Sequence, residues 1–347
     1  MEIERLLKIC TACKGEKKER ERLKEKTACE VLFINSFYAE DVLEHKLKRP
    51  SIIVFFPLLN DMQHMNTFFS HANCCLEIGG QLICHCHTTD SRQKEILDQY
   101  PCGINHIMVV FDFCWSRIIS KIPLTRNLYY RITQGKNRAL HRVEVLGKLY
   151  RAGFEVTYEE ANQGELYIIA SKCKEPIRED KPNTGLFIRL KRIGKNGKII
   201  KVYKFRTMHA YSEYLQSYVY NSSTLVKGDK INNDYRITVW GKFMRKYWID
   251  ELPQLINLIK GDIKLVGVRP LSQHKFSLYD EKLQALRIKT KPGLIPPYYA
   301  DMPENLEELE NSEIRYLESY MKNPFLTDCR YFWKVFKNIV FKGIRSR

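Results

Sequence analysis

The sequence predicts two domains, an N-terminal domain of the α/β class and a C-terminal α+β domain. Its 347 residues exceed the usual size of one domain, so two domains of about 170 residues each are expected. In the first half, strand-length apolar runs alternate with helical segments, which is the α/β rhythm. The net charge of +17 is concentrated in residues 177–347, which hold 32 Lys and Arg against 18 Asp and Glu. The predicted boundaries are a charged helical leader at 1–28, the α/β domain at 29–174, a linker at 175–184 and the second domain at 185–347.

Apolar runs of strand length mark the expected sheet of the N-terminal domain. They are Val31–Asn35, Ile52–Pro57, Gln81–His85 and His106–Phe111, the last within the apolar stretch Ile104–Phe113. A closing helix is predicted over 137–152, because Gly153 follows it. Two further strands, joined by a hairpin-like turn, are predicted at Phe154–Glu159 and Glu165–Ser171.

This order of elements resembles the C-terminal half of a class I methyltransferase, in which a GG turn and a strand precede a helix ending in AGF and a final hairpin. The matching pieces are Gly79-Gly80-Gln81-Leu82 and Ala152-Gly153-Phe154-Glu155-Val156. The resemblance concerns the architecture, because the Gly-rich loop that would hold S-adenosylmethionine and the strand before it are not visible. A structural or partner-binding domain is therefore expected in preference to an active methyltransferase.

Cysteine usage and hydropathy limit the class of protein. Eleven cysteines without a secretory leader or regular spacing favour a reducing compartment. Cys10 and Cys13 form a lone CxxC without a second pair at metal spacing, so zinc or redox chemistry is not expected. No stretch approaches the roughly 18 to 20 apolar residues that span a bilayer, and the N-terminus lacks the apolar core of a signal peptide. We expect a cytoplasmic chain with peripheral membrane contact.

The second domain opens with a basic hairpin. Alternating residues on either side of Lys195-Asn196-Gly197 predict two strands joined by a tight turn. The stretch from Lys181 to Arg206 has nine basic residues and no acidic one. Such a segment suits nucleic acid, an anionic membrane face or nucleotide substrates, and a merely solvated basic face is the alternative.

Two adjacent carboxylates, Asp250 and Glu251, precede Pro253. Since proline is tolerated only in the first turn of a helix, a helix is predicted to begin near Asp250 and to run through Leu258. The helix dipole and free N–H groups there favour an ionised carboxylate and a bound phosphate. An ionised Asp can attack phosphorus while a neighbouring Glu binds magnesium. The simpler alternative is a helix cap with an acid in the first turn.

Two arginines could serve the same site. Arg245 lies five residues before Asp250. Arg269 stands between Gly267 and Pro270, which predicts a rigidly held phosphate clamp, because a guanidinium binds phosphate oxygens bidentately.

Taken together, ordered blocks over about residues 185–345 resemble the bacterial sugar transferase family, the monotopic polyprenyl-phosphate phosphoglycosyltransferases that start glycan assembly. The blocks are Arg192–Gly197, Lys204–Met208, Asp234–Thr238, Ile249–Gln254, Gly261–Pro270 and Lys291–Leu294. Departures from the family pattern are Val268 for a proline, Leu190 for a glutamine, and Trp248-Ile249 where a small polar residue is common. None of these departures removes a reactive group.

The resemblance implies a ping-pong reaction. Asp250 would take the phosphosugar from a nucleotide sugar, expected to carry uridine diphosphate, and release the nucleoside monophosphate. Glu251 would bind Mg²⁺, and a polyprenyl (undecaprenyl) phosphate would then attack the covalent intermediate. The products would serve capsule, exopolysaccharide or O-antigen assembly. The residues implied to contact phosphate or substrate are Arg245, Arg269, Lys204, Arg206, Arg192 and Asp262.

Membrane attachment is expected through the C-terminus. Family members carry an apolar re-entrant helix before the first block, where this chain has the polar segment Cys173–Thr184. The segment Phe332–Lys342, followed by Arg345 and Arg347, has apolar residues at helical spacing with lysines on the other side. It predicts an interfacial helix lying on the membrane, with a core helix as the alternative.

The implied location is the cytoplasmic face of the bacterial inner membrane, peripheral or monotopic. The implied partners are a nucleotide sugar, polyprenyl phosphate, an anionic membrane surface and other glycan-assembly proteins. A non-catalytic regulatory or binding subunit of a glycan-assembly complex is the alternative, against which the retention of Asp250 and Glu251 argues. Nucleic acid is not expected as a partner, since it would leave the two carboxylates idle and no aromatic stacking platform interleaves the basic run.

Overall fold

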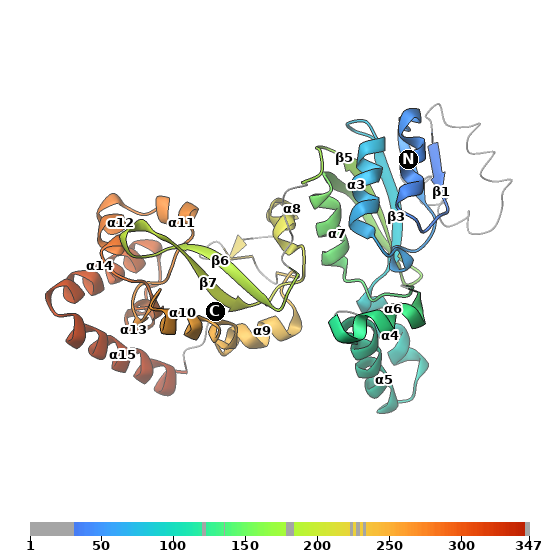
Figure 1. The fold of residues 1–347 in the computed structure, drawn as a ribbon. Helices are drawn as coiled ribbons and strands as arrows, with labels where there is room; N and C mark the ends of the chain where they lie inside the picture. Colours follow the sequence, from blue (N-terminus) through green and yellow to red (C-terminus); the bar gives the residue numbers. More distant parts are fainter. Residues whose placement is uncertain are drawn as a thin grey trace. The chain divides into compact units, whose positions relative to one another are not determined.

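A computed structural model describes residues 31–119, 123–134, 136–177, 184–222, 225–226, 230–231 and 234–343 (Figure 1). The chain divides into two compact units. The N-terminal unit comprises Met1–Pro182 and Ala210–Tyr218, and the C-terminal unit comprises Asn183–His209 and Val219–Arg347. The leader at 1–28 with Cys10 and Cys13, residues 178–183 of the linker, and Arg345 and Arg347 lie outside the described residues.

The N-terminal unit is built on a five-stranded mixed sheet in the order β1-β2-β3-β5-β4. Its strands are β1 (Val31–Ile34), β2 (Ile52–Phe55), β3 (Gln81–His87), β4 (Phe154–Asn162) and β5 (Glu165–Lys172). The first three strands are parallel, whereas β5 pairs antiparallel with both β3 and β4. Because Val54, Ile83 and Ile169 occupy matching positions in three neighbouring strands, they form a buried apolar cluster. The mixed α/β class predicted for this half is confirmed.

Helices surround this sheet. They are the 3₁₀ segments η1 (Glu40–Lys48) and η2 (Leu59–Asp61) and the helices α3 (Met65–Cys75), α4 (Thr89–Gln99) and α7 (Arg142–Arg151). The predicted closing helix over 137–152 is shorter than expected at its start, because Leu140 forms a β-bridge with Thr88 before α7 begins. The side chains from Val143 to Leu149 are all buried, so α7 is a core helix.

The predicted strand at His106–Phe111 is wrong. The apolar stretch forms α5 (Ile104–Phe113), which continues into the π-helical segment η3 (Cys114–Ile119) and is followed by α6 (Pro123–Thr133). An apolar run of ten residues fits a strand or a helix equally well in periodicity, so the sequence pattern alone does not decide between them. The helix satisfies its own backbone hydrogen bonds. Helices α4, α5 and α6 form a group beside the sheet (Figure 1).

A segment from the second half of the sequence, Ala210–Tyr218, belongs to the N-terminal unit. It contains the 3₁₀ segment η5 (Ser212–Leu215) and leads into α8 (Gln216–Ser222). The Tyr211 hydroxyl accepts a hydrogen bond from Asn66 at 2.6 Å. A Cβ at position 147 would lie 2.3 Å from the Tyr211 carbonyl oxygen, so only glycine allows this close approach.

The C-terminal unit carries the predicted basic hairpin. Strands β6 (Phe187–Ile193) and β7 (Ile199–Phe205) pair antiparallel around the 3₁₀ turn η4 (Lys195–Gly197). Asn196 and Gly197 adopt positive φ angles of 57° and 70°, as a tight turn requires. The remaining strands are two short pairs, β8 (Leu225–Val226) with β9 (Lys230–Ile231) and β10 (Lys264–Val266) with β11 (Gly293–Ile295).

The C-terminal unit also contains several helices. They are α9 (Val239–Lys246), η6 (Ile249–Glu251), α10 (Gln254–Lys260), α11 (Gln273–Ser277), α12 (Glu281–Ile288), α13 (Tyr298–Asp301), α14 (Leu306–Lys322) and α15 (Pro324–Phe341). Their core gathers Val266, Val268, Leu271, Tyr279, Leu283, Tyr316, Leu317 and Tyr331. The core thus holds β10 and the segment after it against α12, α14 and α15.

The predicted C-terminal helix is present as α15, and its two faces differ. Tyr331 and Val335 are buried against the core, whereas Trp333, Phe336 and Phe341 are exposed. The helix therefore packs like a core helix on one face and leaves an apolar stripe uncovered on another. Among the helices that the structure describes, none is long and apolar enough to cross a bilayer.

Candidate functional site

The two adjacent carboxylates lie in the turn immediately before α10. Asp250 and Glu251 belong to the 3₁₀ turn η6, and Pro253 follows as the N-cap of α10. The predicted helix start near Asp250 is therefore a 3₁₀ turn followed by an α-helix. Trp248 enters this turn with a positive φ of 56°, and its indole N–H donates to the Tyr299 hydroxyl at 3.0 Å. Asp250 is only 8% exposed.

Two cations converge on the carboxylates. Lys204 Nζ donates to Glu251 Oε1 at 2.6 Å and lies 3.7 Å from Asp250 Oδ2. Arg269 Nη2 donates to the same Oε1 at 2.9 Å. Residues far apart in the sequence thus meet at one point of the C-terminal unit, as the ordered blocks predicted for Asp250, Glu251, Lys204 and Arg269.

The hairpin is fixed to α10 by one buried side chain, Asn257. Its Oδ1 accepts from the Tyr203 backbone N–H at 3.0 Å, and its Nδ2 donates to the Lys201 carbonyl at 2.8 Å. The same Nδ2 lies 3.0 Å from Asp262 Oδ2. These bonds set the register in which β7 presents Lys204. Asp262, predicted to contact substrate, lies in this network and not beside Glu251.

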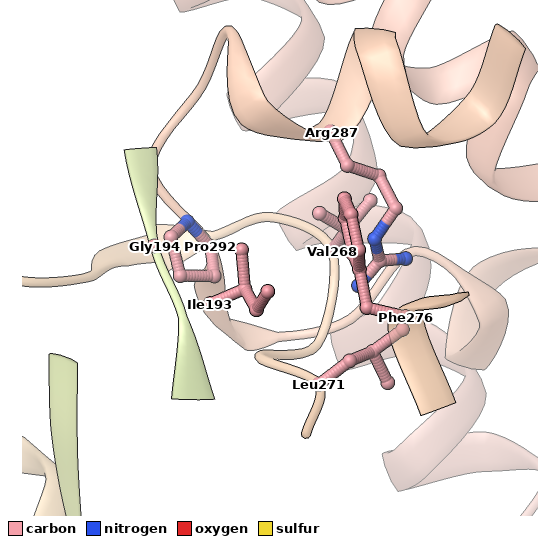
Figure 2. Close-up of a pocket in the computed structure, with 7 residues that line it drawn as sticks. All are labelled: Ile193, Gly194, Val268, Leu271, Phe276, Arg287 and Pro292. Atoms are coloured by element: carbon pink, nitrogen blue, oxygen red, sulfur yellow. The ribbon is translucent and has the colours of Figure 1, made fainter. Parts of the chain in front are cut away.

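Arg269 is held from both its main chain and its side chain. Its Nη1 donates to the Tyr298 hydroxyl at 2.9 Å, and its backbone carbonyl accepts from Arg287 Nη2 at 2.5 Å. Arg287 is buried and paired with Glu313. A small cavity of about 10 Å³, lined in part by Arg287 and Val268, lies beside this segment (Figure 2). That volume holds one water molecule at most, so the cavity is no substrate site.

A glycine contact sets the direction of the strand that leads to Arg269. A Cβ at position 293 would lie 2.1 Å from the Gly267 backbone nitrogen, and a Cβ at position 267 would meet the Gly293 nitrogen at 2.9 Å. Only two glycines allow β10 and β11 to approach this closely. This close packing constrains the segment that carries Arg269, which the sequence predicted to be rigidly held.

Arg245 lies at the end of α9 and donates from Nε to Thr207 Oγ1 at 2.8 Å. Helix α9 begins at Thr238, whose hydroxyl accepts from the Gly241 N–H at 2.8 Å, a capping bond. The neighbouring Asp234 and Arg236 form a buried pair at 2.8 Å. Burial lowers the pKa of the Arg245 guanidinium, and attraction to Asp250 and Asp234 opposes this shift. Arg245 is therefore within electrostatic reach of the carboxylates.

The remaining basic candidates differ in position. Arg206 donates from Nε to the Gly185 carbonyl at 2.9 Å. Arg192 donates to the carbonyl of its neighbour Lys191 at 2.9 Å. Burial lowers the pKa of the Arg192 guanidinium, and repulsion from Arg269 lowers it further. The bond to Gly185 ties Arg206 to the segment before β6.

Burial disfavours the ionised forms of both the acidic and the basic groups in the cluster. It raises the pKa of the Asp250 carboxyl above its usual value, with Lys204 opposing and Glu251 adding to the rise. Burial lowers the pKa of the Lys204 ammonium, although Glu251 opposes that shift. Groups whose ionised forms are disfavoured in this way, next to an open substrate region, are typical of reactive sites.

An apolar groove of about 200 Å³ adjoins Glu251. Its lining comes from α10, β11 and α15 and from the segments beside them, namely Trp248, Leu252, Leu255, Leu294, Ile295, Pro296, Tyr299, Val335 and Ile339. Glu251 is the one charged side chain in the lining. The site thus joins a charged end suited to phosphate with an apolar channel.

The carboxylates suit a hard cation such as Mg²⁺. Mg²⁺ is commonly held by one or two carboxylates together with substrate phosphates and water. Asp250 and Glu251 supply two carboxylates on adjacent residues, and Lys204 and Arg269 both donate to Oε1 of Glu251. Within the described part of the chain, no three His, Cys, Asp or Glu side chains come together to form a metal site. The donor set therefore fits a cation that arrives with a diphosphate.

Two residues of the site were missed in the sequence. Neither was named as a candidate site residue, although the Tyr298 hydroxyl binds Arg269 and Asn257 joins α10 to β7. Pro296-Pro297 before Tyr298 is a rigid stretch that could have indicated an aimed side chain. Nothing in the local sequence indicates that Asn257 meets β7, since the two are more than 50 residues apart.

The bacterial sugar transferase family matches residues 169–342. Galactosyl transferase CpsE of Streptococcus agalactiae is 36% identical over 134 residues, which are 37% of this chain and 29% of that protein. The uncharacterized sugar transferase EpsL of Bacillus subtilis is 41% identical over 109 residues, 31% of this chain and 48% of the relative. The UDP-glucose:undecaprenyl-phosphate glucose-1-phosphate transferase of Klebsiella pneumoniae is 38% identical over 105 residues, 30% of this chain and 20% of the relative. This chain matches less than half the length of each of these three proteins.

Proposed function

The chain belongs to the bacterial sugar transferase family, and we propose that it transfers a sugar 1-phosphate from a nucleotide sugar to a polyprenyl phosphate. The name of the Klebsiella relative specifies UDP-glucose as donor and undecaprenyl phosphate as acceptor, which supports a nucleotide sugar and a polyprenyl phosphate as the substrate classes here. The observation that carries the proposal is the convergence of Lys204 and Arg269 on Glu251 beside the buried Asp250.

In the first half-reaction, a carboxylate oxygen of Asp250 attacks the phosphorus atom that bears the sugar. The bond from this phosphorus to the bridging oxygen breaks, and the nucleoside monophosphate leaves with the electron pair. Lys204 and Arg269 offer N–H donors to the phosphate oxygens. These donors stabilise the negative charge that grows on the leaving group. Arg245, within electrostatic reach of Asp250, adds positive potential from α9.

In the second half-reaction, an oxygen of polyprenyl phosphate attacks the same phosphorus atom. The bond to Asp250 breaks, which regenerates the carboxylate and yields a polyprenyl diphosphate sugar. The apolar groove beside Glu251 fits the first isoprene units of the acceptor, because its lining is almost entirely apolar. The charged end of the site would then hold the acceptor's phosphate.

Magnesium held by Glu251, with Asp250 adjacent, would neutralise the charge of the diphosphate. Lys204 and Arg269 would then orient the carboxylate of Glu251 through their shared contact with Oε1. This role explains why Glu251 is placed between two cations while Asp250 stays available to the substrate.

We propose a membrane-surface location for the C-terminal unit. Three helices of this unit expose apolar side chains: Val239, Trp240 and Phe243 on α9, Leu255 and Ile259 on α10, and Trp333, Phe336 and Phe341 on α15. Exposed apolar faces on helices that also carry lysines are typical of interfacial helices. An acceptor with a long isoprenoid tail would be reached from the bilayer surface.

For the N-terminal unit, the strand order supports a methyltransferase-like architecture without methyl transfer. The antiparallel β5 lies between β3 and β4, as expected for the hairpin at the end of such a fold. We propose a structural or partner-binding role for this unit within a glycan-assembly complex.

The test is release of nucleoside monophosphate by the purified full chain with Mg²⁺, polyprenyl phosphate and a panel of radiolabelled UDP-sugars in detergent. Asp250→Asn should lower turnover about 10⁴-fold and abolish acid-stable labelling of the protein, because the nucleophile is lost. The matched control Asp280→Asn changes an exposed carboxylate that caps α12 in the same unit and should keep wild-type turnover. Unchanged turnover in Asp250→Asn would refute the nucleophile assignment.

A further inference from the structure

Helix α5 of the N-terminal unit presents an apolar face to solvent. Ile104, Ile107, Val110 and Phe111 are 54%, 67%, 62% and 62% exposed. Their spacing of three, three and one places them on one side of a helix. Large apolar side chains gathered in this way are rare on the surface of a soluble unit without a binding role.

The opposite side of α5 is firmly attached to the unit. Asp112 forms a bidentate pair with Arg92 of α4, at 2.6 Å and 2.9 Å. Asn105 Nδ2 donates to the Leu97 carbonyl of α4 at 3.3 Å. The exposed face therefore belongs to a packed helix, and its exposure does not result from a detached segment.

A second exposed apolar pair lies on α6, which contacts η3, the segment that continues α5. In α6, Leu128 and Ile132, four residues apart and so on one face of the helix, are 60% and 59% exposed. Tyr129 of α6 is buried and packs against Trp115 of η3, with ring centroids 5.8 Å apart. We call the six side chains on these two helices the α5–α6 surface, which consists of Ile104, Ile107, Val110, Phe111, Leu128 and Ile132.

The sequence that carries the second half of this surface is strongly basic. Residues 113–143 contain seven Lys or Arg and no Asp or Glu, in a half of the chain whose overall charge is close to balanced. Arg131 at the end of α6 and Lys136 after it are exposed. Positive charge beside exposed apolar residues is the complement of an anionic bilayer surface, where each basic side chain near the lipid contributes about 1 kcal/mol.

We propose that the α5–α6 surface binds the headgroup region of an anionic lipid bilayer, with the apolar side chains inserted and the exposed Arg131 and Lys136 facing lipid phosphates. This gives the N-terminal unit a membrane-binding function of its own. The inference does not depend on the transferase chemistry. It assigns a role to the half of the chain that lies largely outside the family match.

The test is flotation of the full-length protein with vesicles that contain phosphatidylglycerol and phosphatidylcholine. The double variant Ile107→Ser/Phe111→Ser should weaken binding about tenfold or more, because two large apolar contacts are lost. The matched control is Ile78→Ser, since Ile78 is 71% exposed in the same unit but lies outside the surface. Equal binding of the double variant and wild type, or an equal loss in Ile78→Ser, would overturn the proposal.

Further measurements test whether a bilayer or another protein chain occupies this surface, and whether membrane binding is independent of the transferase activity. Arg131→Glu should weaken binding to the anionic vesicles and leave the weaker binding to pure phosphatidylcholine unchanged. If the double variant instead alters the mass of the protein in solution while vesicle binding stays constant, the surface is a contact between protein chains and the proposal is wrong. Nucleoside monophosphate release in detergent should be the same in wild type and double variant, so failure of the transferase proposal leaves this test intact.

Discussion

Buried Asn60 and Lys172 in the N-terminal unit serve a different purpose from the charged side chains around Asp250 in the C-terminal unit. In the N-terminal unit, Asn60 makes three bonds to main-chain atoms: it accepts from the His87 N–H at 2.7 Å and donates to the carbonyls of His87 and Arg138 at 2.8 Å and 2.7 Å. Lys172 Nζ likewise donates to the carbonyls of Asn73 and Leu76. These side chains join elements of the fold, and their partners are fixed parts of it.

In the C-terminal unit, the charged groups of the site are satisfied less completely. Glu251 receives two cations on one oxygen, while Asp250 has Lys204 only at 3.7 Å. Burial raises the pKa of Asp250 and lowers that of Lys204, so the fold opposes the charges that it assembles. The comparison teaches that local stability explains the first set of groups, whereas the second set holds charge against the cost of burial, which local stability does not explain.

The largest effect on activity that would test this comparison is expected for the variant Arg269→Lys. The guanidinium bridges Glu251 and Tyr298 with two nitrogen atoms, and an ammonium cannot span both partners. We expect kcat/KM for nucleoside monophosphate release to fall about 100-fold, with little change in the thermal unfolding midpoint.

Arg315→Lys is the matched control, since Arg315 is an exposed arginine of the same unit with one distant contact to Asp301. Wild-type kinetics are expected for it. If Arg269→Lys retained activity but lost stability, Arg269 would belong with the fold-supporting groups and the contrast between the units would fail.

The converse experiment is Asn60→Ala in the N-terminal unit. Removing its amide leaves three buried main-chain groups of β3 and the segment before α7 without their partner, so the free energy of unfolding should fall by about 2 kcal/mol. Turnover per folded molecule should stay at the wild-type level. Urea unfolding and kcat, measured on the same preparation, would separate the two quantities.

Gln99→Ala, at the exposed end of α4, is the control for loss of an amide side chain. It should leave both stability and turnover unchanged. A large drop in kcat for Asn60→Ala at full folding would show that the N-terminal unit takes part in the chemistry.

The local structure around the candidate site residues could be predicted because each lies in a short motif with local structural meaning. Pro253 placed Asp250 and Glu251 at the start of a helix, and Asn196-Gly197 placed Lys204 on a hairpin strand, as the structure has them. The partner of each motif was less accessible. Tyr298 and Asn257 act through tertiary contacts across 29 and 56 residues, which local patterns do not encode.

The error at Ile104–Phe113 has a related cause. Apolar composition predicted burial in a sheet, but burial is a tertiary property, and α5 keeps much of its apolar surface exposed. The membership of Ala210–Tyr218 in the N-terminal unit was equally unforeseen, because it depends on the close approach of Tyr211 to Gly147. Both features depend on contacts between distant parts of the chain.

The smallest predicted effect is a displacement of the pH profile, and it tests whether the site is tuned as the comparison requires. Asp250 must be ionised to attack phosphorus, and burial raises its pKa. As pH falls, kcat/KM for nucleoside monophosphate release should therefore decline from a higher pH than the usual aspartate range would give. Lys204 must keep its proton, and burial lowers its pKa. The alkaline limb should accordingly begin below the usual lysine range.

Lys204→Arg, which stays protonated, should shift only the alkaline limb upward and leave the acid limb in place. An acid limb at the ordinary aspartate position would mean that Asp250 is as well solvated as a surface carboxylate, which would remove the contrast with the fold-supporting groups of the N-terminal unit.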